Sequence, residues 1–127
     1  MECKRMVPRI LVVEDNEKNL VLMRDLLRYF GYEVLEARDG LECIDMAVKH
    51  CPGLILMDIQ MPVMSGVDAM KRLRMRAETK EIKILAVTSL AMQGDREKLL
   101  GEGFDGYIQK PIDLAELPEI VKKHLRV

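Results

Sequence analysis

The chain has 127 residues, of which 49% are hydrophobic and 32% charged, and twenty Lys and Arg face twenty-one Asp and Glu for a net charge of −1. This length and apolar content predict one domain with a buried core and exclude an intrinsically disordered chain. The near-neutral charge and a longest apolar run of only residues 53–57 predict a cytoplasmic protein without a nucleic-acid or membrane partner.

Short apolar runs recur along the chain and are separated by longer amphipathic stretches. The runs cover residues 10–13, 34–37, 54–57, 84–87 and 107–108. The first, third and fourth runs are apolar without alternation, which is typical of strands buried on both faces of a parallel sheet. The second and fifth runs are weaker, so we expect them at the edges of the sheet.

The amphipathic stretches predict helices over residues 17–30, 40–50, 66–76, 95–102 and 114–126. In the first, Leu20, Met23, Leu27 and Phe30 recur at helical spacing, and Gly31 follows as a stop. Capping side chains precede four of the helices, at Asn16, Asp39, Ser65 and Asp113. Pro118 falls near the first turn of the last helix and leaves its start open.

Five alternations of strand and helix predict an α/β fold with a five-stranded parallel sheet and helices on both faces. The size fits the doubly wound, flavodoxin-like strand order 2-1-3-4-5. We expect one domain over residues 9–127, preceded by a lead-in over residues 1–8 that lacks a signal-peptide core. Because the last predicted helix reaches residue 126, we expect no separate output domain.

Polar side chains stand where the predicted strands end. Glu14 and Asp15 follow the first strand, Asp58 the third, Thr88 the fourth and Lys110 the fifth. In a doubly wound sheet the carboxylates of the first and third strands meet, and such a cluster favours Mg²⁺. With a lysine and a hydroxyl nearby, this combination indicates phosphoryl transfer, with Asp58 attacking phosphorus.

With these residues the sequence resembles the receiver domains of two-component response regulators over residues 9–126. The resemblance rests on Glu14, Asp15, Asp58, Gly66, Thr88, Lys110 and Pro111. It implies that Asp58 accepts a phosphoryl group from a phosphohistidine on a histidine kinase or a histidine phosphotransferase. It also implies self-phosphorylation and slow autodephosphorylation as the protein's only catalysis.

The resemblance assigns a role to each site residue. It implies that Asp15, Asp58 and the backbone carbonyl of Gln60 bind Mg²⁺, with Glu14 in an outer role. Lys110 would pair with the phosphate, and its peptide bond to the following proline is typically cis in the family. Thr88 and Tyr107 resemble the hydroxyl and the aromatic residue that move when the domain is phosphorylated.

The same resemblance implies how the signal leaves the domain. Phosphorylation would switch the face formed by the fourth helix, the fifth strand and the fifth helix, which then binds a downstream target protein. Residues 91–97 resemble both stand-alone cell-cycle regulators and receivers fused to hybrid kinases, and a chain of this length matches the first. We expect a monomer, with phosphorylation-dependent dimerisation as the alternative.

Three other interpretations of the strand ends remain open. An aspartate-nucleophile phosphatase would need a second Asp two residues after Asp58, where this chain has Gln60. A flavodoxin would need a hydroxyl- and glycine-rich loop after the first strand, where residues 14–16 are acidic. A receiver scaffold that no longer uses phosphate would not need its reactive positions intact.

A basic cluster lies outside this constellation. Lys71, Arg72, Arg74 and Arg76 fall on the third predicted helix. Such a cluster is usually a solvated helix face, and the alternative is a docking patch for an acidic partner.

Overall fold

The computed structural model describes residues 8–89 and 94–125, which form five strands and five helices in strict alternation. They are β1 (Arg9–Val13), α1 (Glu17–Tyr29), β2 (Glu33–Ala37), α2 (Gly40–His50), β3 (Leu54–Asp58), α3 (Gly66–Arg74), β4 (Lys83–Thr88), α4 (Asp95–Glu102), β5 (Gly106–Gln109) and α5 (Leu117–Leu125). Residues 1–7 of the predicted lead-in lie outside the described residues. Residues 91–93 of the segment that resembles two receiver subclasses also lie outside them. The predicted α/β fold class is confirmed.

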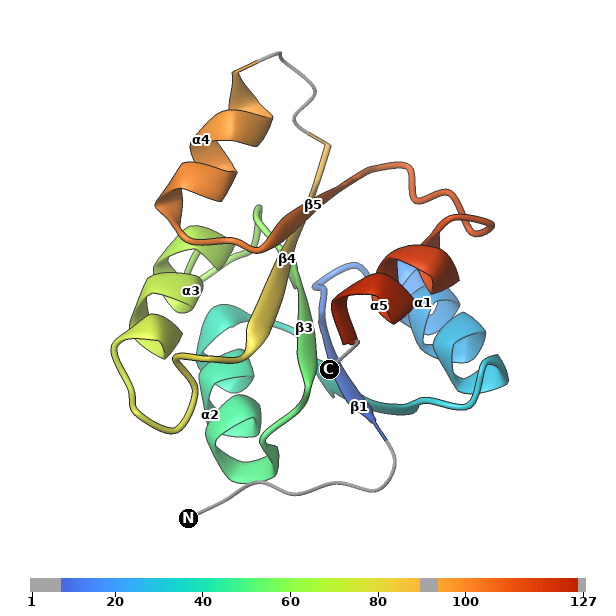
Figure 1. Ribbon diagram of the computed structural model, residues 1–127, viewed down its shortest axis with the longest axis horizontal. Coiled ribbons are helices and arrows are strands. Elements are labelled where there is room, and N and C mark those ends of the chain that lie inside the picture. Colours follow the sequence, from blue (N-terminus) through green and yellow to red (C-terminus); the bar gives the residue numbers. More distant parts are fainter. Residues whose placement is uncertain (1–7, 90–93, 126–127) are drawn as a thin grey trace.

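The five strands form one parallel sheet in the order β2-β1-β3-β4-β5, as predicted. Figure 1 shows α1 and α5 on one face of the sheet and α2, α3 and α4 on the other. Every residue of β3 is buried, whereas the edge strands β2 and β5 are partly exposed. This order places the carboxyl ends of β1 and β3 side by side at the switch point of the sheet.

The sheet divides the apolar core into two halves because successive side chains of a strand point to opposite faces. On β1, Leu11 and Val13 pack in the half beneath α2, α3 and α4, while Ile10 and Val12 pack beneath α1 and α5. All four side chains are almost fully buried. Burial on both faces explains why this strand is apolar without alternation in the sequence.

Side-chain caps start three helices where the sequence predicts them. The side-chain oxygens of Asn16, Asp39 and Ser65 accept hydrogen bonds from the backbone N–H groups of Asn19, Glu42 and Asp68. Each cap satisfies a backbone donor that has no partner inside the helix. The beginnings of α1, α2 and α3 are therefore fixed by local sequence.

Three helix predictions were wrong in detail. Phe30 belongs to no buried stripe: it follows the last residue of α1 and is 51% exposed, with Gly31 at φ +93° ending the helix. The last helix begins at Leu117 rather than at residue 114, because Asp113 first closes a turn by accepting the Ala115 N–H. The third helix ends at residue 74, two residues earlier than predicted.

The helices of this fold are short. None of those in residues 8–89 and 94–125 has the length and apolar content required to cross a bilayer.

Candidate phosphoacceptor site

The site begins at the end of β1. The backbone N–H of Glu14 bonds to the Ala37 carbonyl oxygen at 3.0 Å, which extends the β1–β2 pairing by one residue. The chain then turns, and the Asn16 N–H donates to Glu14 Oε2 at 3.2 Å. Glu14 is consequently buried, at 1% exposure, while Asp15 beside it remains exposed.

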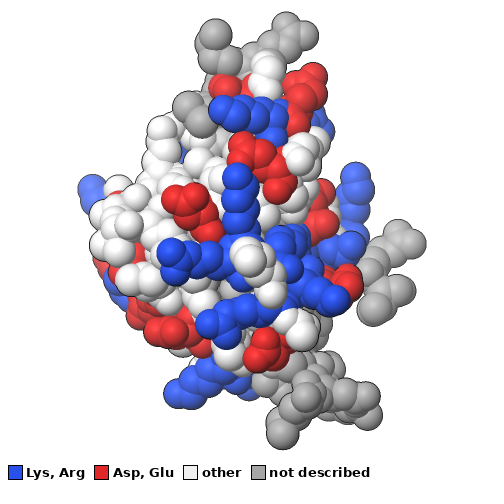
Figure 2. All heavy atoms as spheres, turned by 90° about the vertical axis from the view of Figure 1, so that its left-hand side faces the viewer, with Lys and Arg blue, Asp and Glu red and all other residues white. Residues whose placement is uncertain are grey.

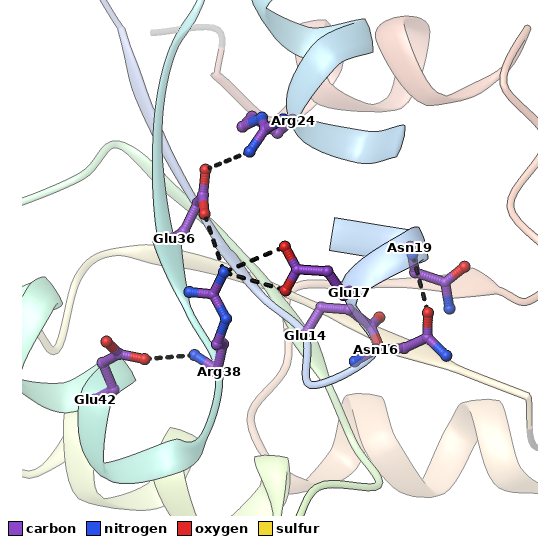
Figure 3. A network of polar contacts seen from close by, with 8 residues as sticks. All are labelled: Glu14, Asn16, Glu17, Asn19, Arg24, Glu36, Arg38 and Glu42. Carbon is purple, nitrogen blue, oxygen red and sulfur yellow. Dashed lines mark hydrogen bonds and ion pairs between the residues drawn. The ribbon is translucent and has the colours of Figure 1, made fainter. Parts of the chain in front are cut away.

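An ionic network holds the start of α1 against the end of β2 next to this turn (Figure 3). The Arg38 guanidinium lies 3.1 Å from Glu17 Oε1 and 3.7 Å from Glu36 Oε1. Arg24 of α1 approaches Glu36 Oε2 to 3.2 Å. Each exposed pair contributes little alone, but the network joins two elements that flank Glu14.

Asp58 is the last residue of β3 and is 3% exposed. The next residue, Ile59, donates its N–H to the Val87 carbonyl oxygen of β4, and the Gln60 N–H donates to Asp58 Oδ1 at 3.1 Å. Gly66 packs directly behind: a Cβ atom there would overlap the carbonyl oxygen of Asp58. The backbone that carries Asp58 is thus fixed from both sides.

Glu14, Asp15 and Asp58 converge, with one carboxylate oxygen from each within 4.8 Å of the others. The Lys110 ammonium enters from the end of β5 and lies 3.2 Å from Glu14 Oε1 and 3.3 Å from Asp58 Oδ2. The meeting predicted from the strand ends is therefore present for these four side chains. One ammonium group opposes three carboxylates.

This imbalance shifts the pKa values of Asp58 and Lys110. Burial, together with the negative charge of Glu14, raises the pKa of Asp58 from 3.8 to about 6, against the opposing effect of Lys110. Burial lowers the pKa of Lys110, but the attraction of Asp58 and Glu14 outweighs it, so the net shift is upward. The lysine therefore stays charged at neutral pH, and the pKa of Asp58 rises to about 6.

The carboxylate cluster fits a divalent cation. Glu14 Oε1 is buried and receives no hydrogen bond from any residue that the structure describes. Its contact with the Lys110 ammonium is an ion pair without hydrogen-bond geometry. Hard oxygen ligands alone, without His or Cys, suit Mg²⁺. A cation would offset both causes that raise the pKa of Asp58, burial and the charge of Glu14.

The remaining predicted site residues surround this cluster. Thr88, 1% exposed, ends β4 next to Asp58, and its carbonyl oxygen accepts the Lys110 N–H at 2.8 Å. Gln60 is held by its N–H bond to Asp58. Tyr107 lies half-buried on the edge strand β5, and the Lys110–Pro111 peptide bond is cis, as the resemblance implies.

Comparison with known proteins decides the family. The family model of the response regulator receiver domain matches the sequence over residues 10–122. The chain belongs to the response regulator receiver domain family. It is similar to the polar-differentiation response regulator DivK of Brucella ovis, with 44% identity over 120 residues that cover 94% of this chain and 98% of the relative. The Brucella anthropi DivK is 45% identical over 116 residues, 91% of this chain and 94% of that one.

Solved receivers share the fold. The receiver domain of a Pseudomonas aeruginosa sensor histidine kinase superposes with a TM-score of 0.86 and 35% identity, covering 94% of this chain and 98% of that one. That structure holds a magnesium ion coordinated in its active-site cleft. The chemotaxis response regulator CheY4 of Vibrio cholerae superposes with a TM-score of 0.88 and 28% identity, over 94% of this chain and 99% of that one.

One residue that stabilises this receiver was assigned wrongly from the sequence. Arg74 is not part of a solvated basic face: it is half-buried and donates to the carbonyl oxygens of Lys80, Ile82 and Gly103. It also pairs with Asp105 at 2.8 Å. Local sequence did not indicate this role, because its partners lie in two separate loops, before β4 and before β5.

Proposed function

The chain is a phosphoacceptor response regulator receiver, and we propose that Asp58 is its phosphorylated residue. The observation that carries this assignment is the convergence of Glu14, Asp15 and Asp58 around the Lys110 ammonium. Of the three carboxylates, Asp58 is the one that ends a central strand, and it shares the Lys110 ammonium with Glu14. Burial, together with the charge of Glu14, raises the pKa of Asp58 to about 6. Asp58 combines access to the cluster with nucleophilic character at neutral pH.

In the proposed reaction an Asp58 carboxylate oxygen attacks phosphorus, while the bond from phosphorus to the donor histidine nitrogen breaks and its electron pair remains on that nitrogen. Asp15, Asp58 and the Gln60 carbonyl would hold Mg²⁺, with Glu14 outside them, and the ion neutralises phosphoryl oxygens when bound. The Lys110 ammonium pairs with another phosphoryl oxygen. The Thr88 hydroxyl donates a hydrogen bond to the group once it is on Asp58.

We propose that this event is transmitted to the face formed by α4, β5 and α5. A cavity of about 390 Å³ lies there, lined among others by Arg96, Tyr107 and Lys110. Lys110 belongs to both the site and this cavity, so withdrawing its ammonium toward a phosphate alters both. Rotation of Tyr107 behind Thr88 would then reshape the surface that a downstream target protein binds.

Membership of the family supports most of the remaining proposals. We propose that the donor is a histidine kinase or a histidine phosphotransferase, and that the receiver itself catalyses only its own phosphorylation and slow dephosphorylation. We place the protein in the cytoplasm, as a monomer or a phosphorylation-dependent dimer. We also propose that the receiver unit spans residues 9–127, with residues 1–8 as a lead-in.

Phosphotransfer from protein histidine tests this function. A purified histidine phosphotransferase carrying ³²P-phosphohistidine should pass its label to the wild-type chain, and Asp58→Asn should receive none. The matched control is Asp45→Asn, which removes an exposed aspartate of α2 and should accept label normally. Transfer to Asp58→Asn at the wild-type rate would show that another residue is the acceptor.

A further inference from the structure

A second surface lies between α2 and α3, apart from the residues assigned above. Leu41, Ile44 and Asp45 of α2 and Arg72 and Arg76 beside them line a pocket of about 310 Å³, hereafter the α2–α3 pocket. Leu41 is 48% exposed although it is a large apolar residue. The pocket therefore combines an apolar floor with two guanidinium groups at its wall.

The two arginines are free to bind something else. Within residues 8–89 and 94–125, neither Arg72 nor Arg76 forms an ion pair or a side-chain hydrogen bond, and both are exposed. The other two basic residues of this segment differ, since Lys71 pairs with Glu102 at 3.3 Å and Arg74 donates to loop carbonyl oxygens. Of the predicted basic cluster, only Arg72 and Arg76 remain available.

Figure 2 views the side of the molecule formed by α2, α3 and α4, and Lys and Arg side chains gather at the centre of this face. Asp68 is the one acidic residue of α3. This face lies across the sheet from α1 and α5. A partner bound to the α2–α3 pocket would leave α5 uncovered.

We propose that the α2–α3 pocket docks an acidic, amphipathic segment of a partner protein. An apolar side chain of the segment contacts Leu41 and Ile44, and flanking carboxylates pair with Arg72 and Arg76. Guanidinium groups bind carboxylates with two parallel hydrogen bonds, and arginines beside an apolar anchor are frequent energetic centres of protein interfaces. This docking does not depend on the phosphorylation of Asp58.

The charge balance favours a protein segment over a polyanion. Asp45 also lines the pocket, so its two arginines leave a single excess positive charge. A nucleic-acid backbone would place phosphates next to Asp45 and would make no apolar contact with Leu41 and Ile44. A segment with few carboxylates around an apolar residue matches both features.

Binding of a designed probe tests the proposal. The probe is a synthetic helical peptide with leucines along one side and glutamates at flanking positions, compared with a peptide of the same composition in scrambled order. We expect saturable binding of the ordered peptide, with NMR shift changes at residues 41–45 and 72–76. The double variant Arg72→Glu/Arg76→Glu should weaken it by at least about tenfold.

Two further variants separate the pocket from general charge effects. Arg28→Glu/Lys123→Glu makes the same change in net charge on exposed residues of α1 and α5 and should alter the affinity by less than about twofold. Leu41→Ser keeps every charge and should still weaken binding, because it removes the apolar contact. Phosphorylated wild-type protein should bind the peptide as tightly as unphosphorylated protein.

Several outcomes would overturn the proposal. They are absence of saturable binding, equal binding of the scrambled peptide, or equal losses in the arginine variant and the α1/α5 variant. A DNA duplex or a phosphatidylglycerol vesicle that binds more tightly than the peptide, and is released by the Arg72→Glu/Arg76→Glu change, would assign the pocket to a polyanion instead. None of these results depends on whether Asp58 is phosphorylated.

Discussion

At the scale of single residues, Asp58 is held ionised at neutral pH against its surroundings. It is buried beside Glu14, and both effects favour its protonated form. The Lys110 ammonium at 3.3 Å compensates only in part. An ionised carboxylate in this position lowers the stability of the fold. The same position favours binding of a cation, which would reduce the repulsion between Asp58 and Glu14, and favours reaction with a phosphoryl group.

Replacing Asp58 with asparagine should therefore stabilise the metal-free protein in a pH-dependent way. The pKa of Asp58 is raised in the folded state, to about 6. Below the pKa of Asp58 in the unfolded chain, the carboxyl is protonated in both states and costs no stability. As the pH rises through 6, the carboxyl ionises in the folded protein and the free energy of unfolding falls. In urea unfolding without Mg²⁺ we expect Asp58→Asn to gain about 1–3 kcal/mol over wild type at pH 8 and little at pH 4.

The control for this measurement is Asp45→Asn on the exposed side of α2, which should change the free energy of unfolding by less than about 0.5 kcal/mol at both pH values. An equal gain for Asp58→Asn at pH 4 and pH 8 would contradict the assigned electrostatic strain.

The sequence was sufficient to predict these acidic residues because each lies within two residues of the end of an apolar run. Glu14, Asp15 and Asp58 are local signals, and the parallel order of the strands brings them together. The role of Gly66 was not accessible in this way. It depends on the approach of its backbone to the Asp58 carbonyl oxygen, which only the packed structure reveals.

At the scale of elements, Arg74 joins the end of α3 to two loops that lead into β4 and β5. Its guanidinium donates to Ile82 O at 2.6 Å, to Gly103 O at 3.1 Å and to Asp105 Oδ2 at 2.8 Å. The same Asp105 oxygen accepts the Ile84 N–H at 2.8 Å. These bonds fix the entry to β5, the strand that Lys110 directly follows.

Truncation of this side chain should destabilise the fold. We expect Arg74→Ala to cost about 2–3 kcal/mol, because carbonyl oxygens and the Asp105 carboxylate lose a charged donor. Arg72→Ala, two residues earlier on α3 and without such bonds, should cost less than about 0.5 kcal/mol. A double-mutant cycle with Asp105→Ala should give a coupling above about 0.5 kcal/mol. Equal costs for the two arginines would refute this role.

Elements also show where local patterns stop being informative. The caps at Asn16, Asp39 and Ser65 were predictable because a cap bonds within three residues. The start of α5 was not, because Asp113 has two local options and forms a turn before the helix begins at Leu117. A helix cap and a turn at Asp113 both use its side chain to accept a nearby backbone N–H, so the sequence alone does not decide between them.

At the scale of the whole molecule, the net charge of −1 hides two opposite concentrations. Three carboxylates gather at the switch point of the sheet, while two arginines that have no ion pair among the described residues border the α2–α3 pocket. The net charge predicts neither feature, because it does not record where along the chain or in the fold the charged residues lie. The fold order 2-1-3-4-5 is what converts scattered strand-end residues into one acidic site.

The most direct test of the central claim is the intact mass of the purified protein after incubation with acetyl phosphate. With Mg²⁺, wild-type protein should gain one phosphoryl group, which hydroxylamine removes, as expected for an acyl phosphate. With EDTA in place of Mg²⁺, or with Asp58→Asn, the mass should not change. A folded wild-type protein that gains no phosphoryl group, or labelling that persists in Asp58→Asn or in EDTA, would contradict the account of Asp58 as a Mg²⁺-dependent phosphoacceptor.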